Sequence, residues 1–82
     1  MKITTESGAV YDITDGFCVK TGHDGEVHSP FKVWVLKPFP EDTPDWDALQ
    51  ALPTGEPVIG QRMYIAGKDE WCISTKVVSV DA

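Results

Sequence analysis

The last stretch of the chain, residues 71–80, most constrains the fold. It reads Trp-Cys-Ile-Ser-Thr-Lys-Val-Val-Ser-Val, with no Gly or Pro to interrupt it, near the end of an 82-residue sequence. β-Branched and aromatic side chains at this density favour a strand. A strand needs partners for its backbone groups, and the other long β-rich segments lie in the N-terminal half. The sequence therefore predicts a fold closed by pairing distant parts of the chain.

The alternation within this stretch is imperfect. Trp71 and Ile73 lie on one face of a regular strand, whereas Val78 and Val80 fall on the other. A bulge or bend near Lys76-Val77 would return the later valines to the core, because one extra residue moves every following side chain to the opposite face of the strand. Such a bend lets one long segment serve two sides of a small barrel.

Two hairpins are predicted before it. Residues 2–5 and 9–13 are β-rich and are joined by Glu6-Ser7-Gly8, where Gly supplies a positive φ. Period two makes Tyr11 and Ile13 the inward pair. Asp15-Gly16 then forms a tight turn into a third strand, residues 17–21, with Phe17 and Val19 on one face.

A polar loop over residues 22–30 leads to a fourth predicted strand, residues 31–36. Apolar side chains occupy both of its faces, so we expect a central strand or one whose outer face is covered. Pro38-Phe39-Pro40 is expected to end this strand. A further strand is predicted over residues 58–66, with Gly60 at a bulge or bend.

A short helix is predicted over about residues 44–52. Asp42 or Thr43 can cap it, and Pro44 suits the first helical position. The apolar stripe consists of Trp46, Leu49 and Leu52. So short a helix is unstable alone in water, and it must dock this face on the sheet or plug an open end of the barrel.

The predicted fold is mainly β, a small antiparallel β-barrel or curved sheet of about six strands with one short inserted helix. Its general type is that of Src-homology-3 or OB domains, and residues 1–82 form a single domain. The predicted core consists of Ile3, Tyr11, Ile13, Phe17, Val19, Val33, Val35, Leu49, Met63, Ile65, Ile73 and Val78.

Composition narrows the function classes. Thirteen acidic residues oppose seven basic ones, a formal charge of −6, which argues against direct nucleic-acid binding because phosphates need a Lys/Arg surface. No apolar run reaches the roughly 20 residues that cross a bilayer, and the N-terminal residues have no apolar core of a signal peptide. We expect no membrane association and a cytoplasmic location.

Catalytic and metal-binding patterns are weak. Cys18, His23, His28 and Cys72 are zinc-ligand types, but no closely spaced pair preforms half a site. Asp24-Gly25-Glu26 and the Asp45/Asp47 pair lack calcium-loop spacing. Cys18 with a histidine could act as a nucleophile, yet no motif supports it. A Cys18–Cys72 disulfide is less favoured than two free thiols. We predict no enzyme, no catalytic residue, no metal and no cofactor.

The segment with most functional promise is residues 38–57, which contains five acids and no Lys or Arg. An acidic rim around an aromatic anchor is typical of a protein-binding patch. Alternatively, the aromatic residues cap the core and the acids only keep the outer face hydrated. The candidate partner-binding residues are Phe39, Glu41, Asp42, Asp45, Trp46 and Asp47.

Both ends of the chain carry a family resemblance. The opening Ile3-Thr4-Thr5-Glu6-Ser7-Gly8-Ala9-Val10-Tyr11-Asp12-Ile13 resembles the start of uncharacterised small all-β proteins from actinobacterial phages and prophages. The stretches Gly55-Glu56-Pro57-Val58 and Ser74-Thr75-Lys76-Val77-Val78-Ser79-Val80 are similar to the way those proteins close. The resemblance implies a fold and a genomic setting, and no catalytic residue.

The leading hypothesis is therefore a non-enzymatic phage or prophage accessory protein that binds another protein, such as a host factor, through residues 38–57. A structural or assembly protein that self-associates through edge strands, or is part of a virion, is the second class. A small metal-binding or hydrolytic protein ranks lowest.

Overall fold

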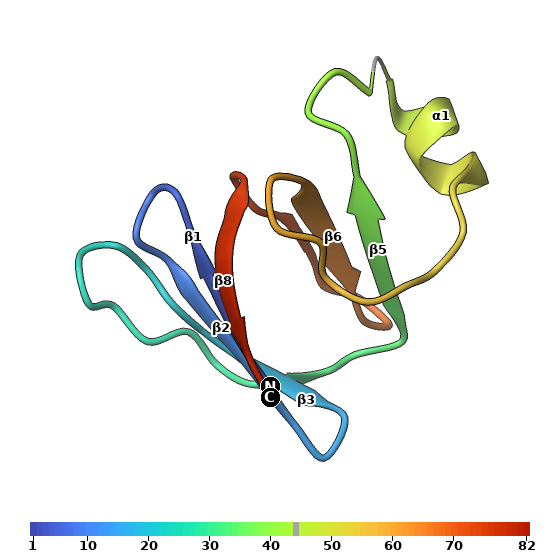
Figure 1. The fold of residues 1–82 in the computed structure, drawn as a ribbon. Coiled ribbons are helices and arrows are strands. Elements are labelled where there is room, and N and C mark those ends of the chain that lie inside the picture. Colours follow the sequence, from blue (N-terminus) through green and yellow to red (C-terminus); the bar gives the residue numbers. More distant parts are fainter. Residues whose placement is uncertain (44) are drawn as a thin grey trace.

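The computed structural model describes residues 1–43 and 45–82, and the chain is built mainly from strands (Figure 1). Within these residues, eight strands and one helix follow one another: β1 (Lys2–Thr5), β2 (Val10–Thr14), β3 (Phe17–Thr21), β4 (Phe31–Lys32), β5 (Val35–Phe39), α1 (Trp46–Ala51), β6 (Arg62–Ala66), β7 (Trp71–Ile73) and β8 (Val77–Asp81). The predicted mainly β fold with one short inserted helix is confirmed.

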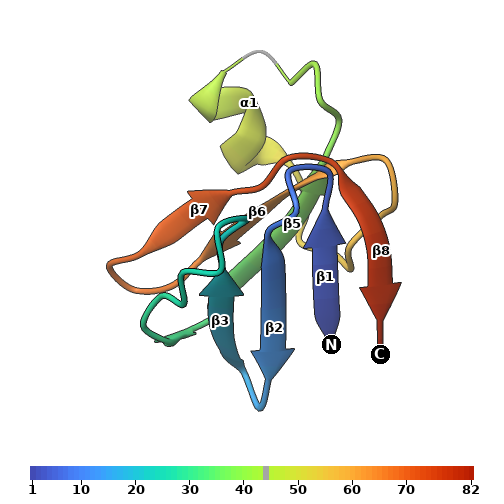
Figure 2. The same cartoon turned by 90° about the vertical axis from the view of Figure 1, so that its left-hand side faces the viewer.

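The strands of the described residues form two antiparallel sheets rather than one closed barrel. One sheet has the order β4-β3-β2-β1-β8 and the other β5-β6-β7. The sheets face each other, and α1 lies on the far side of the smaller one (Figure 1). Strand β1 pairs with β8, with Lys2 opposite Asp81, so both ends of the chain lie together (Figure 2). This pairing confirms that distant segments close the fold.

Two predicted strands each split into two because the chain bends from one sheet into the other. Residues 31–36 break between β4 and β5, where the Val33 amide donates to Gly16 and the Trp34 amide donates to Ala66. Residues 71–80 break at 74–76, between β7 and β8. The bend predicted near Lys76-Val77 is thus confirmed, and the two splits raise the strand number above the predicted six.

Proline does not end β5 where expected. Strand β5 continues through Pro38 to Phe39, with Pro38 opposite Met63. Met63 exchanges its hydrogen bonds with Ser74 on the other side, so Pro38 lies in a pair that is not hydrogen-bonded. The backbone groups at position 38 therefore face away from β6. Because β5 is an edge strand, the lack of an N–H in Pro38 costs no hydrogen bond of the sheet.

The two N-terminal hairpins form as predicted. Residues 6–9 connect β1 to β2, and Asp15-Gly16 connects β2 to β3 with φ values of 53° and 80°. Positive φ at both positions gives the tight turn whose twist matches the flanking strands. The strand predicted over residues 58–66 is shorter than expected. Gly60 lies in a turn with φ 90°, and β6 begins only at Arg62.

A core cluster fills the space between the two sheets. It consists of Ile3, Ala9, Tyr11, Cys18, Met63, Ile65 and Val77, with Ile13 and Val33 packed against it. Three predicted core residues belong neither to this cluster nor to the second cluster, which lies under α1. Phe17 is 49% exposed and Val19 lines the outer face of the larger sheet, because Cys18 pairs with inward-facing Ile13. Val78 is 50% exposed because the bend turns Val77 inward instead.

Helix α1 docks on the outer face of the smaller sheet, as predicted. Leu49 is buried there in a second cluster with Phe39, Tyr64 and Ala66, and Val35 and Ile73 pack against it. Strand β6 is therefore buried on both faces. The helix is shorter than the predicted 44–52, and Asp45 rather than Asp42 or Thr43 caps it. The Thr43 hydroxyl donates to the Pro40 carbonyl instead. The predicted role of Pro44 lies outside the described residues.

Candidate binding surface

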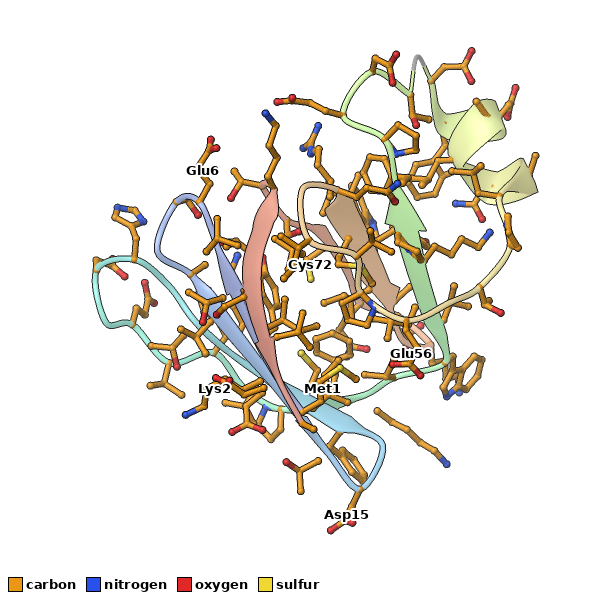
Figure 3. The ribbon with its side chains drawn as sticks, viewed as in Figure 1. Met1, Lys2, Glu6, Asp15, Glu56 and Cys72 are labelled. Carbon is orange, nitrogen blue, oxygen red and sulfur yellow. The ribbon has the colours of Figure 1, made fainter. Side chains whose placement is uncertain are left out.

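Register places Trp71 beside the helix. Trp71 lies opposite Ala66 and Ile73 lies opposite Tyr64, so both side chains of β7 lie on the face that α1 covers. Cys72, between them, points to the space between the sheets (Figure 3). Because β7 is an edge strand, Trp71 lies at the margin of the helix-covered face and remains 59% exposed.

Trp46 and Trp71 form an exposed aromatic pair, which we call the tryptophan pair. Their ring centroids are 5.3 Å apart at an interplanar angle of 60°. Trp46 also meets the buried Tyr64 edge-on, at 5.5 Å and 87°. Trp46 is 47% exposed, so two neighbouring indoles present much of their surface to solvent. Tyr64 supports both rings from below, since its centroid is 6.5 Å from that of Trp71.

The N-terminal turn of α1 sets the position of Trp46. The Asp45 carboxylate accepts a hydrogen bond of 2.8 Å from the Ala48 amide and thereby caps the helix. Trp46 begins the helix and Leu49 follows three residues later on the same side. Burial of Leu49 in the second cluster therefore holds Trp46 over the edge of the sheet.

The C-terminal end of α1 is held by a lysine from β5. Lys37 is buried, and its Nζ donates to the carbonyl oxygens of Gln50 at 2.8 Å and Leu49 at 3.5 Å. The helix has no basic residue in its own last turn, so Lys37 supplies the positive charge that this end of the macrodipole favours. Sequence reasoning missed this role; its only signal was a Lys directly after the predicted strand at residues 31–36, which is apolar on both faces.

The predicted partner-binding residues do not all lie on one surface. Asp42, Asp45 and Asp47 are exposed around the start of α1, and Asp47 is in its first turn. Glu41 is exposed but forms an ion pair with Lys76, 3.0 Å between Oε2 and Nζ. Phe39 is only 4% exposed and belongs to the second core cluster. Phe39 therefore supports the surface from inside and cannot contact a partner in this conformation.

Acidic residues also flank the other member of the tryptophan pair. Asp69 and Glu70 immediately precede Trp71 and are exposed. The sequence predicts Trp71 only as a strand residue, because nothing in the local pattern places residue 71 beside residue 46. A second acidic segment therefore adjoins Trp71, and its Glu70 lines a hollow together with Trp71, Phe31 and Cys72.

A small hollow of about 130 Å³ adjoins Trp46. Trp46 and Asp45 line it together with Arg62, whose guanidinium carbon lies 5.5 Å from the centroid of the Phe39 ring. Arg62 is also fixed by a 2.9 Å hydrogen bond from its Nε to the Ser74 carbonyl. The hollow is therefore bounded by one carboxylate and one anchored cation.

The residues considered for zinc or nucleophilic chemistry do not gather into one cluster of ligands. Cys18 is buried between the sheets, and burial raises the pKa of its thiol from 9.0 to about 12, with the nearby Cys72 adding to the shift. Burial also raises the pKa of Cys72. Both cysteines are free, and His23 and His28 lie on exposed loop positions. Among the described residues, no three potential ligands gather as a metal site would require.

Comparison with protein-family models, with curated proteins and with solved structures finds no match for this chain. No helix among residues 1–43 and 45–82 is long and apolar enough to span a bilayer.

Proposed function

We propose that the chain is a non-enzymatic protein-binding domain, and that the tryptophan pair with its acidic surroundings binds a basic segment of a partner protein. The observation that carries this proposal is the contact between Trp46 and Trp71, 5.3 Å between centroids with both rings about half exposed. Trp is among the residues most enriched at the energetic centre of protein interfaces.

Charge selects the class of partner. Asp42, Asp45 and Asp47 lie around one indole, and Asp69 and Glu70 precede the other. A Lys or Arg side chain that enters this surface gains both Coulombic attraction and a cation–π contact with an indole face. The surface therefore favours a basic segment, whereas an acidic one would be repelled. In this proposal the protein acts in the cytoplasm as a phage or prophage accessory factor with a host protein as partner.

Tryptophan fluorescence tests the aromatic part. We expect a lysine-rich peptide to perturb the emission of the native protein, and Trp46→Ala or Trp71→Ala to weaken its binding about tenfold or more. Trp34→Ala is the matched control because Trp34 is also exposed but lies outside the pair. Equal loss of binding in the Trp34 variant would contradict the assignment.

Charge reversal tests the acidic part. Asp47→Lys should weaken peptide binding and reduce its dependence on salt. Asp81→Lys makes the same change at the exposed end of β8, near the C-terminus, which lies away from α1 (Figure 1) and from β7 (Figure 2). If both variants bind the peptide equally, the charge acts through the whole molecule and the local acidic surface has no part.

A second candidate, self-association in an assembly, is favoured by the outer face of the larger sheet. Phe17 and Val78 are each about half exposed there, and Phe17, Val10 and Val19 line a shallow hollow of about 540 Å³. Native mass spectrometry distinguishes the two candidates, since a dimer that Phe17→Ser dissociates would favour assembly.

A further inference from the structure

Strand β7 has a free edge. Its pairing with β6 is flanked by two hydrogen-bonded pairs, Gly67 with Glu70 and Met63 with Ser74. Antiparallel pairs alternate between bonded and non-bonded, so Cys72 opposite Ile65 is a bonded pair that faces β6. The N–H and C=O groups of Trp71 and Ile73 therefore point away from β6, and no described residue pairs with them.

A groove runs beside this edge, between β7 and the segment that leads into β4. Its volume is about 350 Å³. Trp71, Cys72 and Phe31 provide its apolar lining, and Lys20, His28 and Glu70 its polar lining. At one end the two sides meet, because a Cβ on Gly67 would lie 2.5 Å from the Lys32 carbonyl oxygen. Strand β7 is the edge strand of the smaller sheet and lies at the left margin of the molecule in Figure 2.

We propose that the free edge of β7 binds an extended peptide segment of the partner protein by strand addition; the basic character of that segment rests on the function proposed above. An exposed edge offers a row of unsatisfied donors and acceptors, and an added strand satisfies them with main-chain bonds. The edge offers four such groups, one N–H and one C=O each from Trp71 and Ile73.

Alternation then sets the sequence pattern of the bound segment. Successive side chains of an added strand point to opposite faces of the sheet. On the helix face they meet the tryptophan pair and its acids, which favour Lys or Arg. On the other face they enter the groove beside Phe31 and Cys72, which favours small apolar residues such as valine. The segment therefore alternates basic and apolar residues.

Amide hydrogen exchange, measured by NMR on the full chain, tests this directly. The probe is a short, end-blocked peptide of alternating lysine and valine. We expect the amides of Trp71 and Ile73 to exchange at least about tenfold more slowly with the peptide bound. The Cys72 amide is the internal control, since it already faces β6 and should not change. A peptide that binds without slowing Trp71 and Ile73 overturns strand addition.

Two methylated peptides provide the second arm. One carries N-methyl groups on every lysine amide and the other on every valine amide. Only alternate amides of an added strand point to β7, so one peptide should bind at least about tenfold more weakly than the other. Equal binding by both contradicts main-chain pairing.

The outcomes separate strand addition from the proposed function. A change in tryptophan emission without slowed exchange rejects strand addition and leaves the aromatic surface as the binding site. If the peptide changes neither the tryptophan emission nor the amide exchange, strand addition and the proposed function are both rejected. Equal binding of an alternating glutamate and valine peptide, with slowed exchange, rejects the basic preference and retains strand addition. If the Trp71 and Ile73 amides are already protected without peptide, in proportion to protein concentration, a second copy occupies the edge and strand addition by a partner is wrong.

Discussion

The ammonium nitrogen of Lys37 lies 2.8 Å from the carbonyl oxygen of Gln50, so a strand residue caps the C-terminal end of a helix that starts nine residues after it. The helix is only six residues long, too short to be stable without tertiary contacts. This bond, together with the buried Leu49, fixes α1 on the smaller sheet. Since α1 carries Trp46, the bond also supports the proposed binding surface.

Lys37→Met should destabilise the protein. Methionine retains most of the aliphatic stem but leaves the last carbonyls of α1 without a buried donor, at a cost of about 1–3 kcal/mol. Urea unfolding measures the loss. Lys32→Met is the control because Lys32 is exposed on β4, where it should have little effect. Equal stability of the Lys37→Met protein would contradict the capping role.

Asp45→Ala should cost about 1 kcal/mol in unfolding free energy through loss of the N-cap. Because Trp46 follows directly, its emission should shift towards that of a solvated indole. Asp45→Asn retains an accepting oxygen and should recover most of the stability. Asp42→Ala provides the control, since Asp42 lies before the cap. A similar loss in both alanine variants would mean that charge alone, and no cap, stabilises the helix.

Ser74→Ala should destabilise the bend between β7 and β8. The buried Ser74 hydroxyl accepts a 2.9 Å hydrogen bond from the Met63 amide and donates at 2.7 Å to the Thr75 carbonyl. Removal leaves a buried amide without its partner, a cost of about 1–3 kcal/mol. Thermal unfolding compared with Ser79→Ala, on the outer face of β8, measures the effect. If the Ser74→Ala and Ser79→Ala proteins unfold at the same temperature, the Ser74 hydroxyl does not stabilise the bend.

The thiols predict the response to alkaline pH. Burial holds the pKa of Cys18 at about 12, above its ordinary 9.0, so the unfolded chain ionises first as pH rises. The contribution of the Cys18 thiol to the free energy of unfolding is therefore fully present below about pH 9 and is lost as the pH rises towards 12. We expect the melting temperature to fall more steeply with pH in this window for the native protein than for Cys18→Ala. Parallel curves for the two proteins would show that Cys18 does not contribute.

Local chemistry made much of the fold predictable. Asp15-Gly16 specified its hairpin because both residues accept a positive φ, and the alternation around Tyr11 identified the inward face of β2. The errors arose where two faces were both apolar. In β3, Phe17 and Val19 are more hydrophobic than Cys18 and Lys20, yet pairing with β2 turned Cys18 inward. Register across a sheet, which depends on neighbouring strands, overrode local hydrophobicity.

The candidate site was predictable only in part. The acids and Trp46 on residues 38–57 were visible as a cluster in the sequence. Phe39 was not distinguishable from Trp46 there, because both are aromatic residues in an irregular acidic segment. Packing of α1 against β5 and β6 buries Phe39 and leaves Trp46 exposed.

By itself the sequence determined the strand-rich composition, the turns, the helix and a bend in residues 71–80, since each follows from the φ preferences and periodicity of neighbouring residues. Only the tertiary structure decided that the bend separates two sheets instead of closing a barrel. It also decided that Trp71 meets Trp46 and that the outer backbone of β7 has no partner among the residues the structure describes. Those outcomes depend on contacts between residues far apart in the chain, which no local pattern encodes.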